Sequence, residues 1–544
     1  MKYIFLLFIV FLLINPIWAI TVPGTKDNIP WETWSGEVFK KAGKENRLVI
    51  LDLEAVWCHW CHVMHETTYK DPAISQLIKS KFIPLRVDQD SRPDLSNRYR
   101  EYGWPATIIF NAKGEELIKR AGYIPPDEMK LELERILANP APEEPHIDFA
   151  KIKYSPNAYL SNELKRELIE MHKSSFDTKL GGFKSFQKYL DRDAAEYSLI
   201  CAKNKDQSEV QRVQKTLDAS LMLIDPVWGG VYQYSTMGTW DYPHFEKLAT
   251  LQGEYIRIYS KAYDTLQNKN YLKAAENIHR YIKRFLTSPD GVFYVSQDAD
   301  LVQGQHSYDY FALDDFARRK QGIPRIDKHI YSSQNGLIIN GLISLYNSTH
   351  DEKYLQDAIT ATNWIIKHRT FRGSISQTIS WIFSDLVSTE SILESIKWIL
   401  VNKTWPERGF RHGEVDVAGP YLSDTLYMGQ TFLNLYIATS DKKWLTFSEQ
   451  TARFIKRNFE APIAGFSTSK ASCEVCAVHR PDSLVDENIV LARFANRLFG
   501  YTKEHDYRNI AEHAMRFLST QEIATRTITE PGILIANLEL NPGN

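Results

Sequence analysis

The sequence predicts a multidomain protein: an α/β domain followed by an all-α domain whose helices close into an (α/α)6 barrel. A chain of 544 residues is too long for a single hydrophobic core. Apolar, strand-like runs alternate with helical patterns up to residue 139, and a stiff, charged, proline-rich stretch follows at 139–145. From about residue 153 onward the periodicity is helical and repetitive.

The first domain is organised around an apolar run at 48–56, which reads as a buried strand and leads to Cys58-His-Trp-Cys61. Helical character after Cys61 places this Cys-x-x-Cys motif at a turn from strand to helix. Proline is favoured in a first helical turn, so Asp71-Pro72 begins the next helix. The other expected elements are helices at 72–81, 94–102 and 126–138 and strands at 82–88, 106–111 and 115–121.

The Cys-x-x-Cys motif has the features of a thiol–disulfide exchange centre. Unpaired backbone N–H groups and the positive end of the helix dipole favour a thiolate at Cys58. Cys61 is close enough to resolve a mixed disulfide. Asp52, on the inferred strand, is a candidate buried proton acceptor for the second thiol. Pro105 opens the strand at 106–111, and a cis proline there would set a backbone edge for a substrate chain beside the disulfide.

Three segments resemble the spermatogenesis-associated thioredoxin-like proteins and their bacterial relatives, namely Cys58–Met64, Val87–Asp94 and Gly103–Pro105. In that family a thioredoxin-like domain is followed by a long all-helical barrel, so the resemblance implies the same order here. The expected boundaries are a signal peptide at 1–19, a thioredoxin-like domain at 20–139, a linker at 140–152 and a six-hairpin barrel at 153–544.

The helical part carries a repeat that can be read directly. A short polar turn and then an apolar helical face accompany each of Asn270-Tyr-Leu272, Lys353-Tyr-Leu355, Lys443-Trp-Leu445 and Asp506-Tyr-Arg508. Repeated hairpins that each bury one face against their neighbours imply a closed or stacked array. Counting gives five or six pairs, which suits an (α/α)6 barrel. Residues 371–392 fit the repeat poorly and are left unassigned.

The first functional hypothesis is thiol–disulfide exchange, with protein thiols or disulfides, or a redox donor protein, as partners. Cys58 attacks, Cys61 resolves, Asp52 relays a proton and Pro105 shapes the docking edge. A sulfur that exchanges bonds with another protein must be reachable, so we expect Cys58 to be open to solvent and close to Pro105. A Cys58 walled off from solvent, or a distant Pro105, would count against this hypothesis and direct attention to the helical domain. The sequence leaves the direction of electron transfer open, and a permanent disulfide in a non-catalytic binding module is the alternative.

The barrel raises a second hypothesis, a sugar-processing enzyme of the epimerase or glycosidase kind. Glycosidases need paired carboxylates, and epimerases need a base such as histidine. The cavity candidates lie in motifs that resemble those lining the barrel cavity in the family, and they are His244, Glu246, Asp298, Asp300 and Asp424. Asp298 and Asp300 are two residues apart and would face the same way in an extended loop. A barrel that only binds a carbohydrate-like ligand or a client is a third reading.

No metal and no cofactor are expected beyond a Cys58–Cys61 disulfide. Zinc is the weaker alternative, since His62 follows Cys58, and His65 follows Cys61, by four residues on one helical face. A cysteine at a helix start, opposite a strand that begins with proline, serves redox chemistry better. The second motif, Cys473-Glu-Val-Cys476, is expected to form a structural disulfide, with a redox relay or a metal site as alternatives.

The N-terminus predicts export to the periplasm or another extracytoplasmic compartment. Lys2, an apolar core at 4–14 and the small residue Ala19 read as a secretory signal cleaved after Ala19, and an uncleaved anchor is the alternative. The formal net charge is −2 and no long basic block occurs, so nothing points to nucleic acid. The oligomeric state is not fixed by the sequence.

Overall fold

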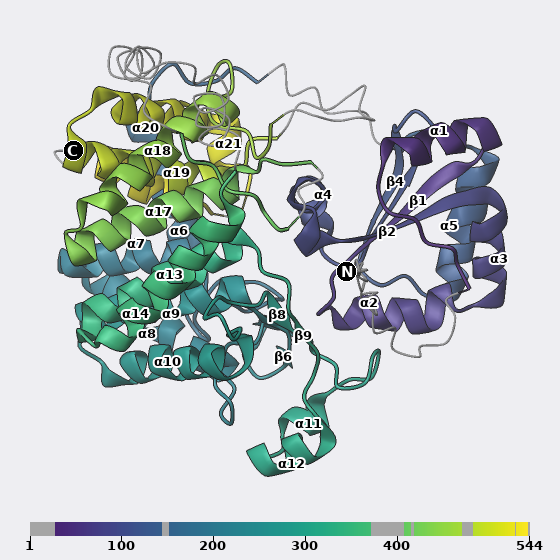
Figure 1. The fold of residues 1–544 in the computed structure, drawn as a ribbon, viewed down its shortest axis with the longest axis horizontal. Helices are drawn as coiled ribbons and strands as arrows, with labels where there is room; N and C mark the ends of the chain where they lie inside the picture. Colours follow the sequence, from purple (N-terminus) through teal and green to yellow (C-terminus); the bar gives the residue numbers. More distant parts are fainter. Residues whose placement is uncertain are drawn as a thin grey trace, which may run out of the picture.

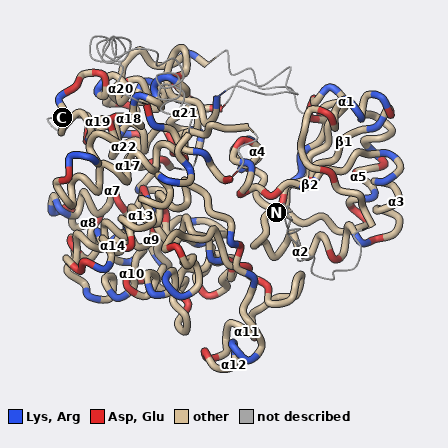
Figure 2. Tube along the Cα trace, viewed as in Figure 1, with Lys and Arg blue, Asp and Glu red and all other residues tan. Residues whose placement is uncertain are grey.

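The computed structural model describes residues 28–143, 152–371, 407–414, 418–470, 482–527 and 529–541. The expected signal peptide, nearly all of the unassigned segment at 371–392 and the second Cys-x-x-Cys motif at Cys473 and Cys476 lie outside the described residues. The described chain forms an α/β domain and a larger helical domain (Figure 1). Acidic and basic residues are interspersed over both of them (Figure 2).

The α/β domain is built on one four-stranded sheet. Its strands are β1 (Leu48–Glu54), β2 (Phe82–Asp88), β3 (Ala106–Phe110) and β4 (Glu116–Ala121). Their order in the sheet is β2-β1-β3-β4, with β1 parallel to β2 and antiparallel to β3. The helices are α1 (Gly36–Glu45), α2 (His59–Met64), α3 (Pro72–Lys81), α4 (Pro93–Tyr99) and α5 (Pro126–Ala138). The predicted alternation of elements is confirmed, and α3 and β2 have the predicted bounds.

Helices cover both faces of this sheet because its central strands are apolar on both sides. Along β1, Ile50 packs into the cluster with residues of α3 and α5, whereas Val49 and Leu51 pack with residues of α1. Successive side chains of a strand point to opposite faces, so a strand buried on both sides reads as a continuous apolar run. The run that predicted β1 from the sequence therefore reflects burial between two layers of helices.

The helical domain is a closed barrel, which confirms the predicted fold class. Among the described residues, its inner ring consists of α7 (Arg192–Lys203), α9 (Ala249–Leu266), α13 (Ser332–Thr349), α17 (Leu422–Thr439), α19 (Val485–Thr502) and α22 (Pro531–Leu540). Each inner helix packs against the next, and α22 returns to α7. The outer helices are α6 (Asn162–Ser174), α8 (Gln207–Ser220), α10 (Lys269–Tyr281), α14 (Glu352–Arg369), α18 (Lys442–Phe459) and α20 (His505–Leu518).

The sequence repeat corresponds to a repeated hairpin. Helices α9, α13, α17 and α19 each have 18 residues and end at one left-handed residue, respectively Gln267, His350, Ser440 and Lys503. The following outer helix carries a buried aromatic ring at its third residue, namely Tyr271, Tyr354, Trp444 and Tyr507. These four rings are the aromatic residues that the sequence repeat singles out.

Long loops precede the inner helices and gather at the end of the barrel where those helices begin. They carry the short strands β5 (Tyr234–Ser235), β6 (Pro243–His244), β7 (Lys247–Leu248), β8 (Ser296–Gln297) and β9 (Ile326–Asp327), and the short helices α11 (Tyr308–Phe311) and α12 (Asp315–Gln321). Strands β7, β8 and β9 form one small sheet. None of the helices described here combines the length and the apolar character needed to cross a membrane.

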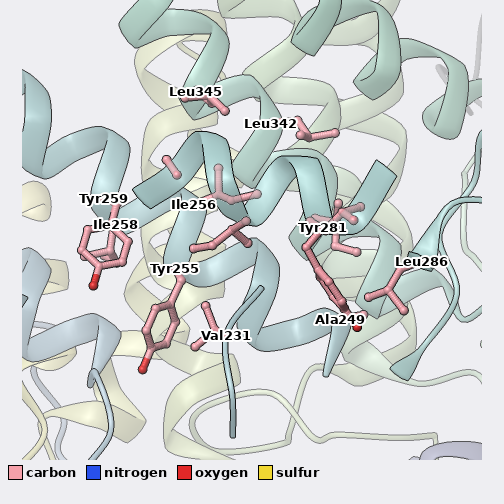
Figure 3. Packing of buried hydrophobic residues seen from close by; sticks show 14 of the residues in the cluster. Val231, Ala249, Tyr255, Ile256, Ile258, Tyr259, Tyr281, Leu286, Leu342 and Leu345 are labelled. Carbon is pink, nitrogen blue, oxygen red and sulfur yellow. The ribbon is translucent and has the colours of Figure 1, made fainter. Parts of the chain in front are cut away.

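Helices α9 and α13 approach closely because glycines face each other across their contact. A Cβ atom on Gly341 would lie 2.5 Å from the carbonyl oxygen of Gly253. Around this crossing, Ile256 of α9 and Leu342 and Leu345 of α13 belong to the main core cluster (Figure 3). The small residues therefore set the spacing of the inner ring at this point.

We expect Gly341→Ala to destabilise the barrel, because the added methyl group meets backbone that cannot move without separating α9 from α13. Overpacking of this kind costs about 1–3 kcal/mol. The measurement is the urea midpoint of unfolding. Gly500→Ala is the matched control, since a Cβ there meets nothing within 4 Å and an alanine favours the helix. A midpoint for Gly341→Ala equal to that of Gly500→Ala would contradict the expectation.

Candidate active site between the two domains

The α/β domain is docked on the end of the barrel where the inner helices begin. The polar contacts that join them there include His412 Nε2 to the Asp90 carbonyl at 2.7 Å, Tyr421 to Asp94 at 3.1 Å, Arg100 to Asp486 at 3.2 Å and Arg526 to Glu101 at 2.9 Å. Helix α4 lies between the sheet and the barrel (Figure 1). The loops at the barrel mouth thus face the α/β domain rather than open solvent.

The Cys-x-x-Cys motif stands at the end of β1, where the chain turns into α2. Cys58 is the N-cap residue, and its Sγ accepts a hydrogen bond from the Cys61 N–H at 3.1 Å. The two sulfurs form a disulfide. Pro105 follows a cis peptide bond and precedes β3, whose first residue pairs with Leu53 near the end of β1. Trp104 packs against the apolar cluster that contains both cysteines, so the Pro105 segment lies beside the motif.

The disulfide is covered, which corrects the expectation that Cys58 would be open to solvent. Cys58 and Cys61 are 4% and 3% exposed. Leu248, from the loop before α9, packs with Trp104 against them, and the Ala299 N–H donates to the Trp57 carbonyl at 3.4 Å. The cover comes from barrel loops far along the chain, so nothing within the first domain could have predicted it.

Asp52 lies on β1, is buried, and is not a free base. Its Oδ2 accepts a hydrogen bond from Arg86 Nε at 3.1 Å. Glu54, two residues later on the same face of the strand, was not among the predicted site residues. Loss of hydration and the nearby Asp52 carboxylate raise the pKa of Glu54 to about 8. Its place two residues after Asp52 was the available sequence signal for this second carboxyl group.

Four of the five cavity candidates from the barrel gather at the Cys-x-x-Cys motif. Asp300 accepts hydrogen bonds from His59 Nδ1 at 2.7 Å and from His62 Nδ1 at 3.0 Å, one to each carboxylate oxygen. Asp298 lies 3.7 Å from the same His62 nitrogen. Burial disfavours a charge on Asp300, but hydrogen bonds from the His59 and His62 imidazoles hold its pKa below the usual value. Burial raises the pKa of Asp298 to about 6.

The other two candidates of this group, His244 and Glu246, also lie near His59. The Glu246 Oε1 accepts the backbone N–H of His59 at 3.3 Å. Burial raises the pKa of Glu246 to about 7, and burial together with the charge of His59 lowers the pKa of His244 to about 4. With Asp300 and His306 they line a small polar cavity. The predicted barrel residues thus contribute to the surroundings of the redox motif.

Asp424, the fifth candidate, lies elsewhere at the mouth. It is fully buried and accepts hydrogen bonds from His412 Nδ1 at 3.0 Å and from the Ser333 N–H at 2.9 Å. His412 in turn reaches the Asp90 carbonyl. Asp424 therefore holds a docking histidine, and the sequence reasoning did not single out His412.

A cluster of acids close to Asp90 is the second feature missed from the sequence. Trp57 Nε1 donates to Asp90 Oδ2 at 2.7 Å. Burial, then the charges of Asp90 and Asp327, raise the pKa of Asp88 to about 8, and burial raises that of Asp90 to about 6. His329 is bonded to Asp327 on the barrel side. The run Val87–Asp94 was quoted as a motif, but its acids had no assigned role.

His62, Asp298 and Asp300 are the described residues best placed to hold a metal ion. One ligand atom from each lies within 4.8 Å of the other two. Hydrogen bonds already engage these atoms, and His62 Nε2 faces the Val56 carbonyl at 3.2 Å. The alternative zinc set of cysteines with His62 and His65 is not assembled, since Arg86 donates to His65 Nδ1 and the sulfurs are joined to each other.

A thioredoxin-like domain that closes over a helical barrel, with a disulfide at their junction, defines the class of this protein. A family model described as "Thioredox_DsbH: Protein of unknown function, DUF255" matches residues 22–139. Spermatogenesis-associated protein 20 of Mus musculus is 27% identical over 313 residues, which cover 50% of this chain and 39% of the mouse protein. The chain is thus similar to the spermatogenesis-associated thioredoxin-like proteins, as its motifs predict.

Two further similarities concern parts of the chain. Thiol:disulfide interchange protein DsbD of Campylobacter jejuni (strain RM1221) is 27% identical over 126 residues, 22% of this chain and 22% of that protein. The structure of cellobiose 2-epimerase from Bacillus thermoamylovorans B4167 has a TM-score of 0.48 at 10% identity, covering 66% of this chain and 87% of that chain. The chain spans well under two thirds of the mouse and Campylobacter proteins.

We expect Asp300→Asn to expose the redox motif. Loss of the carboxylate weakens two hydrogen bonds to histidines, each worth about 1.5–3 kcal/mol when one partner is charged. Alkylation of Cys58 by iodoacetamide in the reduced protein should become roughly tenfold faster or more, since 1.4 kcal/mol is a factor of ten. Peptide mass spectrometry identifies the modified cysteine. Asp309→Asn, an exposed acid, is the control, and equal rates for the two variants would refute the role of Asp300.

We also expect the stability of the protein to fall as the pH rises from about 4 to about 8. The pKa of Asp88 in the folded protein is about 8, above the value near 4 of an unfolded chain, so the folded state binds the extra proton. Asp88→Asn should reduce the difference between urea midpoints measured at pH 5 and pH 8. An unchanged difference would show that Asp88 does not titrate in this range.

Proposed function

We propose that the protein is an exported thiol–disulfide oxidoreductase that acts through Cys58 and Cys61 on protein thiols or disulfides, or exchanges with a redox donor protein. The observation that carries the proposal is the disulfide at the start of α2 beside the Pro105 segment. A helix N-terminus favours the thiolate form of the attacking cysteine. The similarity to a thiol:disulfide interchange protein supports the same chemistry.

In the reducing direction, the Cys58 thiolate attacks one sulfur of a substrate disulfide and releases the other as a thiolate. Cys61 then attacks Cys58 Sγ, breaks the mixed disulfide and releases the second substrate thiolate. Two electrons pass from the cysteine pair to the substrate, and the protein disulfide is restored. We assign the proton of Cys61 to the carboxyl pair Asp52 and Glu54, at the end of the strand that leads into the motif.

The barrel acts in this scheme as a cover and as part of the site. Asp300 orients His59 and His62 through the hydrogen bonds described above, and Leu248 closes over the sulfurs. A polypeptide substrate reaches Cys58 once these loops move away, whereas the closed arrangement protects the pair from chance oxidants. Four residues first considered for sugar chemistry are engaged around the motif, so redox chemistry is the function that this geometry supports best.

Export rests on the N-terminal sequence, where Lys2, the apolar core at 4–14 and Ala19 form a secretory signal. Disulfides form and persist outside the cytoplasm, which is where an exchange protein finds its substrates. No cofactor is needed beyond the cysteine pair.

We expect Cys61→Ser to accumulate a mixed disulfide through Cys58, because attack still occurs but resolution does not. Cys58→Ser should form none and should lose the reduction of insulin by dithiothreitol down to the uncatalysed rate. Non-reducing electrophoresis and mass spectrometry detect the trapped partner. Cys201→Ser is the matched control, since Cys201 lies on α7 in the barrel and is a free thiol. Insulin reduction by Cys58→Ser at the parent rate would exclude the proposed function.

A further inference from the structure

A polar cavity lies beside the disulfide, and its walls come from both domains. His59 contributes from the α/β domain, and His244, Glu246 and His306 contribute from the barrel. The side chain of His306 is exposed, so the cavity has a side that reaches solvent while the sulfurs remain covered.

Glu246 is the unusual group in this cavity. It is 3% exposed, and its Oε2 has no hydrogen-bond partner. By contrast, Asp298 and Asp300 have His59 and His62 as partners. A buried carboxylate oxygen without a donor costs free energy, and a ligand that supplies an N–H or O–H group would recover it. The empty acceptor position therefore suits an ammonium or another N–H or O–H donor.

The cavity is placed so that a ligand held at Glu246 is close to the reactive sulfur. Its Oε1 already accepts the N–H of the residue that follows Cys58, so the Oε2 lies within a few bond lengths of that cysteine. Leu248, two residues after Glu246, packs against the apolar cluster that contains both cysteines. A small molecule with its donor group at Glu246 therefore has its sulfur, a few atoms away, near Cys58.

The size and charge of the cavity restrict which ligands it can hold. It has room for about one water molecule, so it accepts a single small polar group and excludes a polypeptide segment. Burial lowers the pKa of His244 to about 4, so His244 is uncharged at neutral pH and does not repel a cation. An ammonium group fits these conditions, and a carboxylate beside Glu246 does not.

We propose that this cavity binds the ammonium group of a small aminothiol disulfide at Glu246 and brings its sulfur toward Cys58, which makes such disulfides preferred substrates. This inference rests on the proposed thiol–disulfide activity. Reduced Cys58 attacks the near sulfur and releases one aminothiol, and Cys61 then releases the second while the protein disulfide forms. Two electrons pass to the small disulfide, and an external dithiol returns the protein to its reduced state.

The experiment compares three symmetric disulfides that differ in their terminal group: cystamine, bis(2-hydroxyethyl) disulfide and 3,3′-dithiodipropionate. The reduced full-length protein is mixed with each, and the rate is divided by the rate of free dithiothreitol with the same disulfide, which removes intrinsic reactivity. We expect a normalised preference for cystamine over dithiodipropionate of about tenfold, the effect of one favourable ion pair of about 1.4 kcal/mol. Glu246→Gln should raise KM for cystamine and abolish the preference.

The matched control is Asp309→Asn, which removes an exposed negative charge near His306 and should keep the preference. Equal normalised rates for the three disulfides in the parent protein would overturn the inference, and this result does not depend on the folding of any variant. A preference that survives Glu246→Gln would overturn it as well. If the parent protein reduces none of the three disulfides and no insulin, the proposed function itself fails. Reduction of insulin without a preference among the small disulfides would overturn only this inference and would leave the proposed function in place.

Discussion

The structure depends on one carboxylate that is shared between two histidines of the redox motif. Asp300 belongs to the barrel, and its oxygens face His59 and His62 on either side of Cys61. These residues are more than two hundred positions apart in sequence. Because a buried carboxylate is stable only with its partners, the loop that carries Asp300 and the helix that carries the histidines must meet for either to be well placed. The docking of the domains and the geometry of the redox centre therefore depend on the same buried contacts.

Much of the fold could be predicted because its signals are local. The run of apolar residues predicted β1, and the Asp71-Pro72 pair predicted the start of α3. The repeated aromatic residues at 271, 354, 444 and 507 indicated the outer helices. Asp298 and Asp300 were correctly seen as a pair with a common direction. What they point at could not be predicted, since that depends on the closed ring of helices and on how the first domain rests upon it.

The burial of Cys58 is another property that local sequence could not predict. Its place at a strand-to-helix turn follows from neighbouring residues, but its exposure is decided by Leu248 and by the loop that contains Ala299. Hydrophobic pattern reports whether a residue lies inside a domain and carries no information on contacts between domains. Glu54 and His412 were missed for a related reason, because their roles arise from the partners Asp52, Asp424 and Asp90.

The acids at the barrel mouth fall into two groups with different physical origins. Asp193, Asp424 and Asp486 stand in the first turns of inner helices, where the helix dipole stabilises a negative charge whatever the protein does. Glu246 stands in the loop between β6 and β7, has no such helix behind it, and its Oε2 lacks a hydrogen-bond partner. The exposed ion pairs that fasten the domains, such as Arg526 with Glu101, are screened by salt and are weak. Separation of the domains is thus governed by the buried cluster beside the sulfur.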